Sequence, residues 1–226
     1  MSGAPDAAMI FAAGFGTRME DLTRETPKPM VQLAGRPMIE HAIELVREAG
    51  IERVFANTHY LPHKIEPHLQ SLGVTTVREE TKILDTGGGL RAAMPYLGPG
   101  PVITLNPDAA WTGPNPIKGL LSAWTEDMRA LLLLVPLSDA RTTREDGDFS
   151  LEHGQIRRKG EYLYTGAQII RTSDLHRIPE NAFSLNRYWD LLAADGPIHG
   201  IIHRGGWCDI GTPAGLADAE AMLKDV

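Results

Sequence analysis

Short apolar runs alternate with longer amphipathic stretches over the first 137 residues of the chain. The runs have the length of buried strands, and the amphipathic stretches have the apolar spacing of helices that pack on one face. This β-α order predicts an α/β fold of Rossmann-like type, in which a mixed, mostly parallel sheet is flanked by helices. The predicted strands are 9–13, 51–57, 74–78, 101–105 and 130–137, and the predicted helices are 37–49, 61–72, 90–97 and 117–126.

The pattern changes after about residue 139, where short strands follow one another without a helix between them. Strands are expected at 149–151, 156–158 and 162–171, with turns at His153-Gly154 and Lys159-Gly160. A helix at 185–194, a strand at 198–203 and a helix at 213–223 then return the chain to the main body. We expect one domain over 1–226 with two halves, about 1–110 and about 111–226, the second containing a small β-rich insertion.

The composition narrows the class of protein. With 226 residues, 42% of them hydrophobic, the chain can form one sizeable core. The formal net charge of −7 disfavours a broad nucleic-acid surface but is compatible with a local basic pocket. One cysteine cannot form an internal disulfide, and no apolar run approaches the roughly 20 residues that span a bilayer. We therefore expect a cytoplasmic protein without nucleic-acid or membrane partners, and the sequence does not indicate an oligomeric state.

A glycine-rich segment, 11–19 (Phe-Ala-Ala-Gly-Phe-Gly-Thr-Arg-Met), follows the first predicted strand. Gly14 and Gly16 let a ligand approach the backbone closely, and free amide N–H groups in such a loop bind phosphate oxygens. A dinucleotide fingerprint needs a third glycine where Met19 stands, and a P-loop needs Gly-Lys followed by Ser or Thr, so both motifs fit poorly. Taken alone, the segment indicates either a phosphate-binding loop or an ordinary turn.

Two cationic side chains favour the phosphate-binding alternative. Arg18 lies at the end of the glycine-rich segment, and Lys28 lies within Thr-Pro-Lys-Pro-Met, 26–30, where two prolines restrict the backbone. A rigidly presented ammonium suits the role of a point charge on a phosphate. We therefore take Arg18 and Lys28 as candidate catalytic residues.

With these motifs, the sequence resembles the sugar-1-phosphate nucleotidyltransferase family. The resemblance begins with Ala-Ala-Gly-x-Gly-Thr-Arg-Met and Thr-Pro-Lys-Pro and covers nearly the whole chain. It continues, in the order of the family, through Glu80, 83–89 (Ile-Leu-Asp-Thr-Gly-Gly-Gly), Asn106-x-Asp108, 146–149 (Asp-Gly-Asp-Phe), Thr165-Gly166 and 207–212 (Trp-Cys-Asp-Ile-Gly-Thr). The resemblance implies attack of a sugar 1-phosphate on the α-phosphorus of an NTP, with release of pyrophosphate and formation of an NDP-sugar.

Two aspartates are candidate ligands of a magnesium ion. Asp108 comes directly after the predicted strand 101–105, and Asp209 follows another strand-like segment, so both are expected at the carboxyl ends of strands, where ligands of such sheets bind. Two carboxylates from distant positions suit Mg²⁺ that also binds phosphate oxygens. The resemblance implies that Asp108 and Asp209 are the metal ligands. Pro107 stands where the family usually has glycine, so the backbone around Asp108 is expected to differ.

The resemblance also implies a division of the chain between the two substrates. The half of about 1–110 is expected to bind the nucleotide and the half of about 111–226 the sugar. The expected nucleotide-binding residues are Ala12, Ala13, Gly14, Gly16, Thr17, Glu80, Gly87, Gly88 and Asn106, and the expected sugar-phosphate residues are Thr165, Gly166 and Arg204. A carboxylate at Glu80 could accept a hydrogen bond from uracil N3–H or from guanine, so this chemistry does not choose the base.

The sequence allows more than one pair of substrates, and it allows one function without catalysis. Within the family the chain is most similar to the short bacterial branch that accepts muramate 1-phosphates in peptidoglycan recycling, which implies UTP and N-acetylmuramate 1-phosphate. Mannose 1-phosphate with GTP, and glucose 1-phosphate with UTP or dTTP, are the alternatives within the enzyme class. Pro107 motivates another class, a catalytically silent nucleotide- or sugar-binding regulator. A nicotinamide-dependent oxidoreductase is disfavoured by Met19 and by Asn57-Thr58, where an acidic residue would end the second strand.

Overall fold

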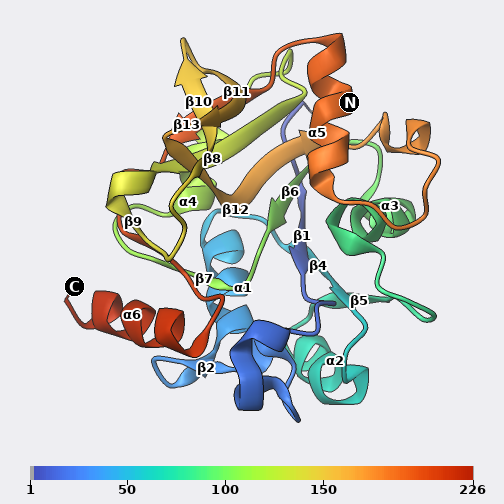
Figure 1. The fold of residues 1–226 in the computed structure, drawn as a ribbon. Helices are drawn as coiled ribbons and strands as arrows, with labels where there is room; N and C mark the ends of the chain where they lie inside the picture. Colours follow the sequence, from blue (N-terminus) through green and yellow to red (C-terminus); the bar gives the residue numbers. More distant parts are fainter. Residues whose placement is uncertain (1–2, 226) are drawn as a thin grey trace.

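A nine-stranded sheet runs through the computed structural model, which describes residues 3–225 (Figure 1). The order of its strands is β10-β11-β13-β8-β12-β6-β1-β4-β5, so strands from both halves of the chain share one sheet. These strands are β1 (Ala7–Phe11), β4 (Arg53–Thr58), β5 (Thr75–Arg78), β6 (Pro101–Leu105), β8 (Ala130–Pro136), β10 (Gly147–Glu152), β11 (Gln155–Gly160), β12 (Tyr162–Arg171) and β13 (His199–Ile202).

The direction of the strands differs between the two halves of the sheet. The strands β6, β1, β4 and β5 are parallel neighbours, as the β-α order of the N-terminal half predicts. The long strand β12 runs antiparallel to both of its neighbours, β6 and β8, and β10 and β11 form an antiparallel hairpin. The predicted mixed α/β sheet is confirmed: four of its eight neighbouring pairs are parallel, three of them in the N-terminal half and the fourth between β8 and β13. The predicted β-rich insertion is an extension of this sheet at the β10 edge.

Helices cover both faces of the sheet because its central strands are apolar on both sides. In β8, for example, Leu132 and Leu134 face one core and Leu131 and Leu133 face the other. The first core packs against α3 (Asp85–Leu97) and α5 (Leu185–Asp195). The second packs against α1 (Met38–Glu48), α2 (Pro62–Ser71) and α4 (Pro116–Ala123). Within the described range 3–225, no helix is both long and apolar enough to cross a bilayer.

A third, smaller core lies beyond the carboxyl end of β1, where α6 (Pro213–Lys224) packs against the segment that follows the glycines (Figure 1). A short three-stranded sheet supports it and consists of β7 (Ala109–Trp111), β14 (Trp207–Asp209) and β9 (Ala140–Arg141). The remaining elements are short. They are the hairpin of β2 (Gln32–Leu33) and β3 (Arg36–Pro37) and the 3₁₀ segments η1 (Thr17–Thr23), η2 (Lys28–Met30), η3 (Leu137–Asp139) and η4 (Leu175–Arg177).

The start of α3 differs from the prediction. The helix begins at Asp85, whereas the apolar pattern placed its start at residue 90 and left the three glycines in a loop. Gly87, Gly88 and Gly89 are buried in its first turns, where the amides of Gly87 and Gly88 both donate to the carbonyl of Phe183 at 2.9 and 3.0 Å. A Cβ on Gly87 would lie 2.4 Å from the Phe183 ring. These glycines therefore allow close packing of the helix, a role that helix propensity does not predict.

Candidate active site

The carboxyl ends of β1, β4 and β6 meet at one edge of the sheet, where two adjoining cavities open. We call the first the loop cavity, of about 220 Å³, which is lined by Phe11, Ala13, Gly14, Asn57 and Ile83. We call the second the central cavity, of about 350 Å³, which reaches across to β10, β12, α5 and β14. The two cavities share Asp85, Thr86, Asn106 and Asp108. This is the edge at which open α/β sheets bind their ligands.

The two glycines of the glycine-rich loop have different surroundings. Gly16 has φ +66°, and a Cβ at that position would lie only 2.7 Å from the Cβ of Lys28. Among the described atoms outside the neighbouring residues, nothing lies within 4 Å of a Cβ built on Gly14, so its face is open toward the loop cavity. The amide of Ala12 already donates to the side chain of Asn57 at 2.8 Å. Ala13 and Gly14 are therefore the predicted loop residues best placed to meet a ligand.

Two buried polar residues that the sequence analysis missed support this loop. The Asn57 side chain accepts a hydrogen bond from the Ala12 amide and donates one to the Glu79 carboxylate at 2.7 Å. Glu79 also accepts a hydrogen bond from the amide of Leu84 at 2.7 Å. Glu79 thereby joins the end of β5 to the start of α3. The alternation of Val77 and Glu79, both buried, with exposed neighbours could have identified Glu79 as the inward carboxylate.

The predicted Lys28 and Asp108 form an ion pair in which Asp108 lines both cavities, whereas Lys28 lines neither and reaches them through Asp108. Lys28 Nζ donates to Asp108 Oδ2 at 2.5 Å, and the two side chains are 12% and 26% exposed. Lys28 begins η2, and the amides of Met30 and Val31 bond back to the carbonyls of Pro27 and Lys28 at 2.8 and 3.0 Å. The short 3₁₀ turn fixes the backbone that carries the ammonium. Asp108 keeps this contact although Pro107 precedes it.

Asp209 is brought beside Asp108 by the pairing of β14 with β7. Asp209 lies opposite Ala109 in this pair, and the amide of Ile210 donates to the Asp108 carbonyl at 2.9 Å. Burial and the negative charge of Asp108 raise the pKa of Asp209, whereas the charges of Lys28, Arg18 and Arg144 oppose this rise. A Cβ on Gly211 would lie 2.9 Å from a guanidinium nitrogen of Arg18 and 3.3 Å from an Asp209 carboxylate oxygen. The carboxylates of Asp108 and Asp209 thus lie near three cationic side chains.

This donor set fits a divalent cation that is completed by its substrates. Burial is the main cause of the raised pKa of Asp209 and the charge of Asp108 adds to it, so a cation bound beside the two carboxylates would favour their ionised forms. In the part of the chain that the structure describes, no group of three or more His, Cys, Asp or Glu could hold a metal ion. A site formed by protein groups alone is therefore not present among these residues. Mg²⁺ often binds through one or two carboxylates together with phosphate oxygens and water, which Asp108 and Asp209 can accommodate.

The far side of the central cavity is formed by the second half of the chain. Thr165 and Gly166 line it, as the resemblance implies, and the amide of Asn106 donates to the Gly166 carbonyl at 2.9 Å. The Thr165 hydroxyl donates to the buried Leu133 carbonyl at 2.8 Å. Two aromatic side chains of this wall, Tyr164 and Trp189, lie edge to face at 4.8 Å between ring centroids. The wall thus combines peptide groups with aromatic surface, which suits a sugar ring.

Several predicted residues lie outside these cavities. Glu80 and Arg204 are exposed, and neither lines the loop cavity or the central cavity among the residues described. The amides of Gly87 and Gly88 bond to Phe183, so they are not available to a base. Thr17 begins η1 on the Arg18 side of the loop. The geometry therefore brings Arg18, Lys28, Asn106, Asp108 and Asp209 together and leaves Glu80 and Arg204 apart.

The single cysteine has no nucleophilic role in this geometry. Cys208 is fully buried in the small core behind Asp209, and burial raises the pKa of its thiol to about 11. A thiol with such a pKa is protonated at neutral pH and unreactive.

Comparison with known proteins points to nucleotidyl transfer. The model of the MobA-like NTP transferase domain matches residues 8–172. The chain is 34% identical to N-acetylmuramate alpha-1-phosphate uridylyltransferase of Caulobacter vibrioides over 100% of both chains. It is 29% identical to the protein of the same name from Neisseria meningitidis, over 95% of this chain and 97% of that one. It is also 29% identical to a probable mannose-1-phosphate guanylyltransferase of Oryza sativa, over 91% of this chain and 61% of that one.

Solved structures share the fold. The inositol-1-phosphate CTP transferase from T. maritima superposes with a TM-score of 0.80 at 20% identity and covers 100% of this chain and 98% of its own. A putative glucose-1-phosphate thymidylyltransferase from Bacillus anthracis gives a TM-score of 0.81 at 18% identity, with coverage of 97% and 96%. These likenesses confirm the predicted α/β fold.

Proposed function

This chain belongs to the MobA-like NTP transferase family and is a sugar-1-phosphate nucleotidyltransferase, and we propose that it transfers the uridylyl group of UTP to N-acetylmuramate 1-phosphate. The observation that carries the choice of substrates is the similarity to the uridylyltransferase of Caulobacter vibrioides over the full length of both chains. The ion pair of Lys28 with Asp108, which lines both cavities and lies beside Asp209, supports a site for two anionic substrates.

The lining of the two cavities supports the assignment of one cavity to each substrate. Every residue that lines the loop cavity comes from the half of about 1–110, so we assign the nucleotide to it. The wall of the central cavity comes mainly from the half of about 111–226, so we assign the sugar 1-phosphate to it. The phosphates would then meet where the cavities join, at Asn106 and Asp108.

The reaction is a direct displacement at phosphorus. A phosphate oxygen of the sugar 1-phosphate forms a bond to the α-phosphorus while the bond from that phosphorus to the bridging oxygen of the β-phosphate breaks, and pyrophosphate leaves with the electron pair. The attacking group is an anion at neutral pH, so no residue has to remove a proton. The protein must instead bring two anions together, and positioning contributes on the order of 7–11 kcal/mol in favourable cases.

The charged residues of the site overcome the repulsion between the substrates. Lys28 presents its ammonium from a fixed turn, and Arg18 lies beside Asp209, so both can stabilise charge that develops on the phosphate oxygens. Asp108 and Asp209 would hold Mg²⁺, which when bound shields the negative charge of the reacting phosphates. Ala13 and Gly14 would face the triphosphate from the open side of the loop.

A substrate matrix tests the proposed function. UTP, dTTP, GTP and CTP are each combined with N-acetylmuramate, glucose and mannose 1-phosphates in the presence of Mg²⁺, and pyrophosphate release is measured. We expect the highest kcat/KM for UTP with N-acetylmuramate 1-phosphate. A preference for GTP with mannose 1-phosphate would overturn the substrate assignment, and an absence of pyrophosphate in every combination would favour a silent binding protein. The highest kcat/KM for UTP with N-acetylmuramate 1-phosphate would also support a role in cytoplasmic recycling of peptidoglycan.

A further inference from the structure

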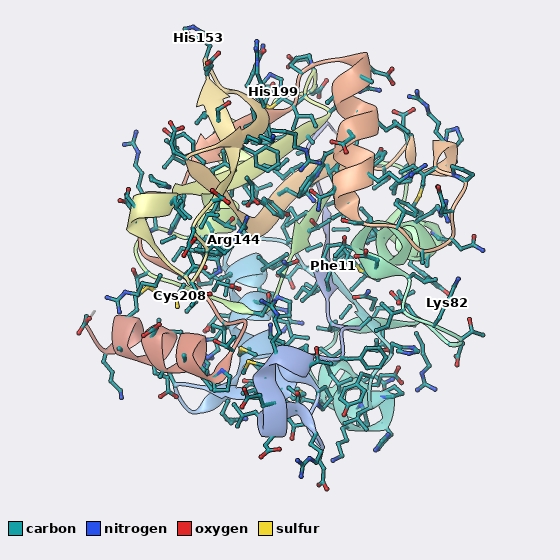
Figure 2. The ribbon with its side chains drawn as sticks, in the orientation of Figure 1. Phe11, Lys82, Arg144, His153, His199 and Cys208 are labelled. Carbon is teal, nitrogen blue, oxygen red and sulfur yellow. The ribbon has the colours of Figure 1, made fainter. Side chains whose placement is uncertain are left out.

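Arg144 is a cation of the central cavity to which the family motifs assign no role. It lies in the segment between β9 and β10, comes from the second half of the chain, and lines the cavity together with Asp148 and Phe149. Figure 2 shows Arg144 near the middle of the molecule, whereas His153, at the tip of the β10–β11 hairpin, and Lys82 lie toward its edges. Arg144 is therefore a site residue despite its position in an irregular segment.

Asp148 holds the guanidinium of Arg144 in a defined orientation. The two side chains form a bidentate pair, with Nη1 to Oδ2 at 2.9 Å and Nη2 to Oδ1 at 2.5 Å. Asp148 is in turn fixed by the amide of Tyr164, which donates to its Oδ2 at 2.9 Å. An arginine has five N–H donors, and this pair uses two of them. Over residues 3–225 the guanidinium makes no other hydrogen bond, so three donors remain for a ligand.

Two other cations already lie where the phosphates would meet. Lys28 and Arg18, both from the nucleotide half, already face Asp108 and Asp209 where the phosphates would meet. The charge of Arg144 also acts on Asp209, but its guanidinium is paired with Asp148 and lines the cavity beside Tyr164 and Trp189, which would face the sugar ring. A neutral sugar offers only hydroxyl and amide groups to this wall. A pre-oriented guanidinium matches a carboxylate, which it can bind through charge-assisted hydrogen bonds.

We propose that Arg144 binds a carboxylate carried by the sugar ring of the acceptor and thereby selects acidic sugar 1-phosphates over neutral ones. The inference rests on the proposed function, because N-acetylmuramate differs from N-acetylglucosamine by an ether-linked lactyl group that carries a carboxylate. Asp148 is the positioning residue that orients the guanidinium. The selectivity of the enzyme for its acceptor would thus depend on a residue outside the family motifs.

The test compares two acceptors that differ only in this group. The kcat/KM values for N-acetylmuramate 1-phosphate and N-acetylglucosamine 1-phosphate, both with UTP and Mg²⁺, are measured for the unmodified enzyme and for Arg144→Gln. We expect the variant to lose roughly 10- to 100-fold in kcat/KM for the acidic acceptor, mainly through KM, because it loses hydrogen bonds to a charged group. Its value for the neutral acceptor should change little, so the ratio of the two values falls by the same factor.

A matched control and a conservative variant separate this role from general effects. Arg141→Gln removes the same charge from β9, three residues away, where the side chain pairs with Asp225 outside both cavities, and should leave the ratio unchanged. Arg144→Lys keeps the charge and should retain part of the selectivity. The Arg144 side chain is 43% exposed, so neither substitution is expected to impair folding, which thermal unfolding checks.

The possible failures are distinguishable. If the unmodified enzyme prefers the acidic acceptor and Arg144→Gln keeps the same ratio, the assignment of Arg144 is wrong and the proposed function stands. Equal losses for both acceptors would likewise overturn the assignment, because Arg144 would then serve the shared phosphate or the fold. If the unmodified enzyme prefers the neutral acceptor, the proposed substrate and the inference both fail.

Discussion

At the scale of single residues, the structure gives the predicted cations and carboxylates different surroundings. Lys28 is nearly buried and bonded to Asp108, whereas Arg18 lies on an exposed segment beside Asp209. Lys28 is thus the more rigid of the two cations. Its contribution is expected to appear in turnover, because a preorganised charge acts most strongly where charge develops.

Replacement of Lys28 by alanine tests this role. We expect kcat to fall by about 100- to 1,000-fold, as happens when one preorganised donor is removed from an active site. Pyrophosphate release gives the rate, and circular dichroism verifies that the variant is folded. Lys118→Ala, at an exposed position of α4 away from both cavities, is the matched control and should retain normal turnover. Near-normal turnover of Lys28→Ala would remove Lys28 from the mechanism.

The proposed metal ligands give a separate prediction. EDTA should abolish activity and excess Mg²⁺ should restore it, because the two carboxylates by themselves leave the phosphates unshielded. Asp209→Asn should raise the Mg²⁺ concentration needed for half-maximal rate, since the variant retains only one carboxylate at the site. An unchanged Mg²⁺ requirement in this variant would show that Asp209 does not bind the metal.

At the scale of elements, the glycine-rich loop contains two glycines with different physical roles. Gly16 has φ +66° and touches Lys28, whereas Gly14 has open space where a side chain would stand. Gly16 is therefore required by its left-handed backbone conformation, whereas Gly14 is required, in our proposal, because the ligand occupies the space of a side chain. A pair of alanine substitutions separates these roles.

Gly16→Ala should lower the free energy of unfolding by about 1–2 kcal/mol, because alanine is disfavoured in the left-handed region, and its contact with Lys28 adds to this cost. Gly14→Ala should leave stability nearly unchanged but raise the KM for UTP, since its methyl group would occupy the loop cavity. Urea denaturation and initial-rate kinetics measure the two effects. If Gly14→Ala binds UTP normally, the triphosphate does not lie against this loop.

The hydrogen bonds of Asn57 to Ala12 and Glu79 are predicted to stabilise the glycine-rich loop. Asn57→Ala would leave the Ala12 amide and a Glu79 oxygen without their partner, and each unsatisfied buried group costs about 1–3 kcal/mol. We therefore expect a loss of about 2–4 kcal/mol in the free energy of unfolding, measured in urea. Asn181→Ala, at an exposed loop position, is the control. A loss no greater than that of the control would show that these hydrogen bonds are dispensable.

The sequence predicted those elements best in which hydrophobic burial dominates. The strand β6 was predicted with its observed bounds and β8 to within one residue, because both are apolar on each face. The strands β7, β9 and β14 have two or three residues each, too few for a periodic pattern. The start of α3 was misplaced because glycine has a poor helix propensity, and the contact with Phe183 that outweighs it comes from a distant part of the chain.

Contacts between distant parts of the chain also limit how much of the site could be predicted. Arg18, Lys28, Asp108 and Asp209 lie in recognisable motifs, and the structure brings them together. Alternation with Val77 marks Glu79 as an inward side chain, but no local pattern marks the bonds of Asn57 to residues 45 and 22 positions away. Arg144 lies in an irregular segment whose place in the cavity depends on the packing of β10.

At the scale of the whole molecule, one sheet joins the two halves that we assign to the two substrates. The strand β12 of the second half pairs with β6 of the first, and the amide of Asn106 bonds to Gly166 across this pair. The substrates would therefore meet where the halves are connected by backbone hydrogen bonds. This arrangement explains how a site built from distant motifs keeps a fixed geometry.

The central claim is direct nucleotidyl transfer between these halves, and the fate of the α-phosphorus tests it most directly. UTP labelled at the α-phosphate is incubated with the enzyme, Mg²⁺ and N-acetylmuramate 1-phosphate, and the products are separated. We predict that the label appears in UDP-N-acetylmuramate, in equal amount to the pyrophosphate released, and only when the acceptor is present. Label found in UMP, or pyrophosphate released without acceptor, would contradict the account.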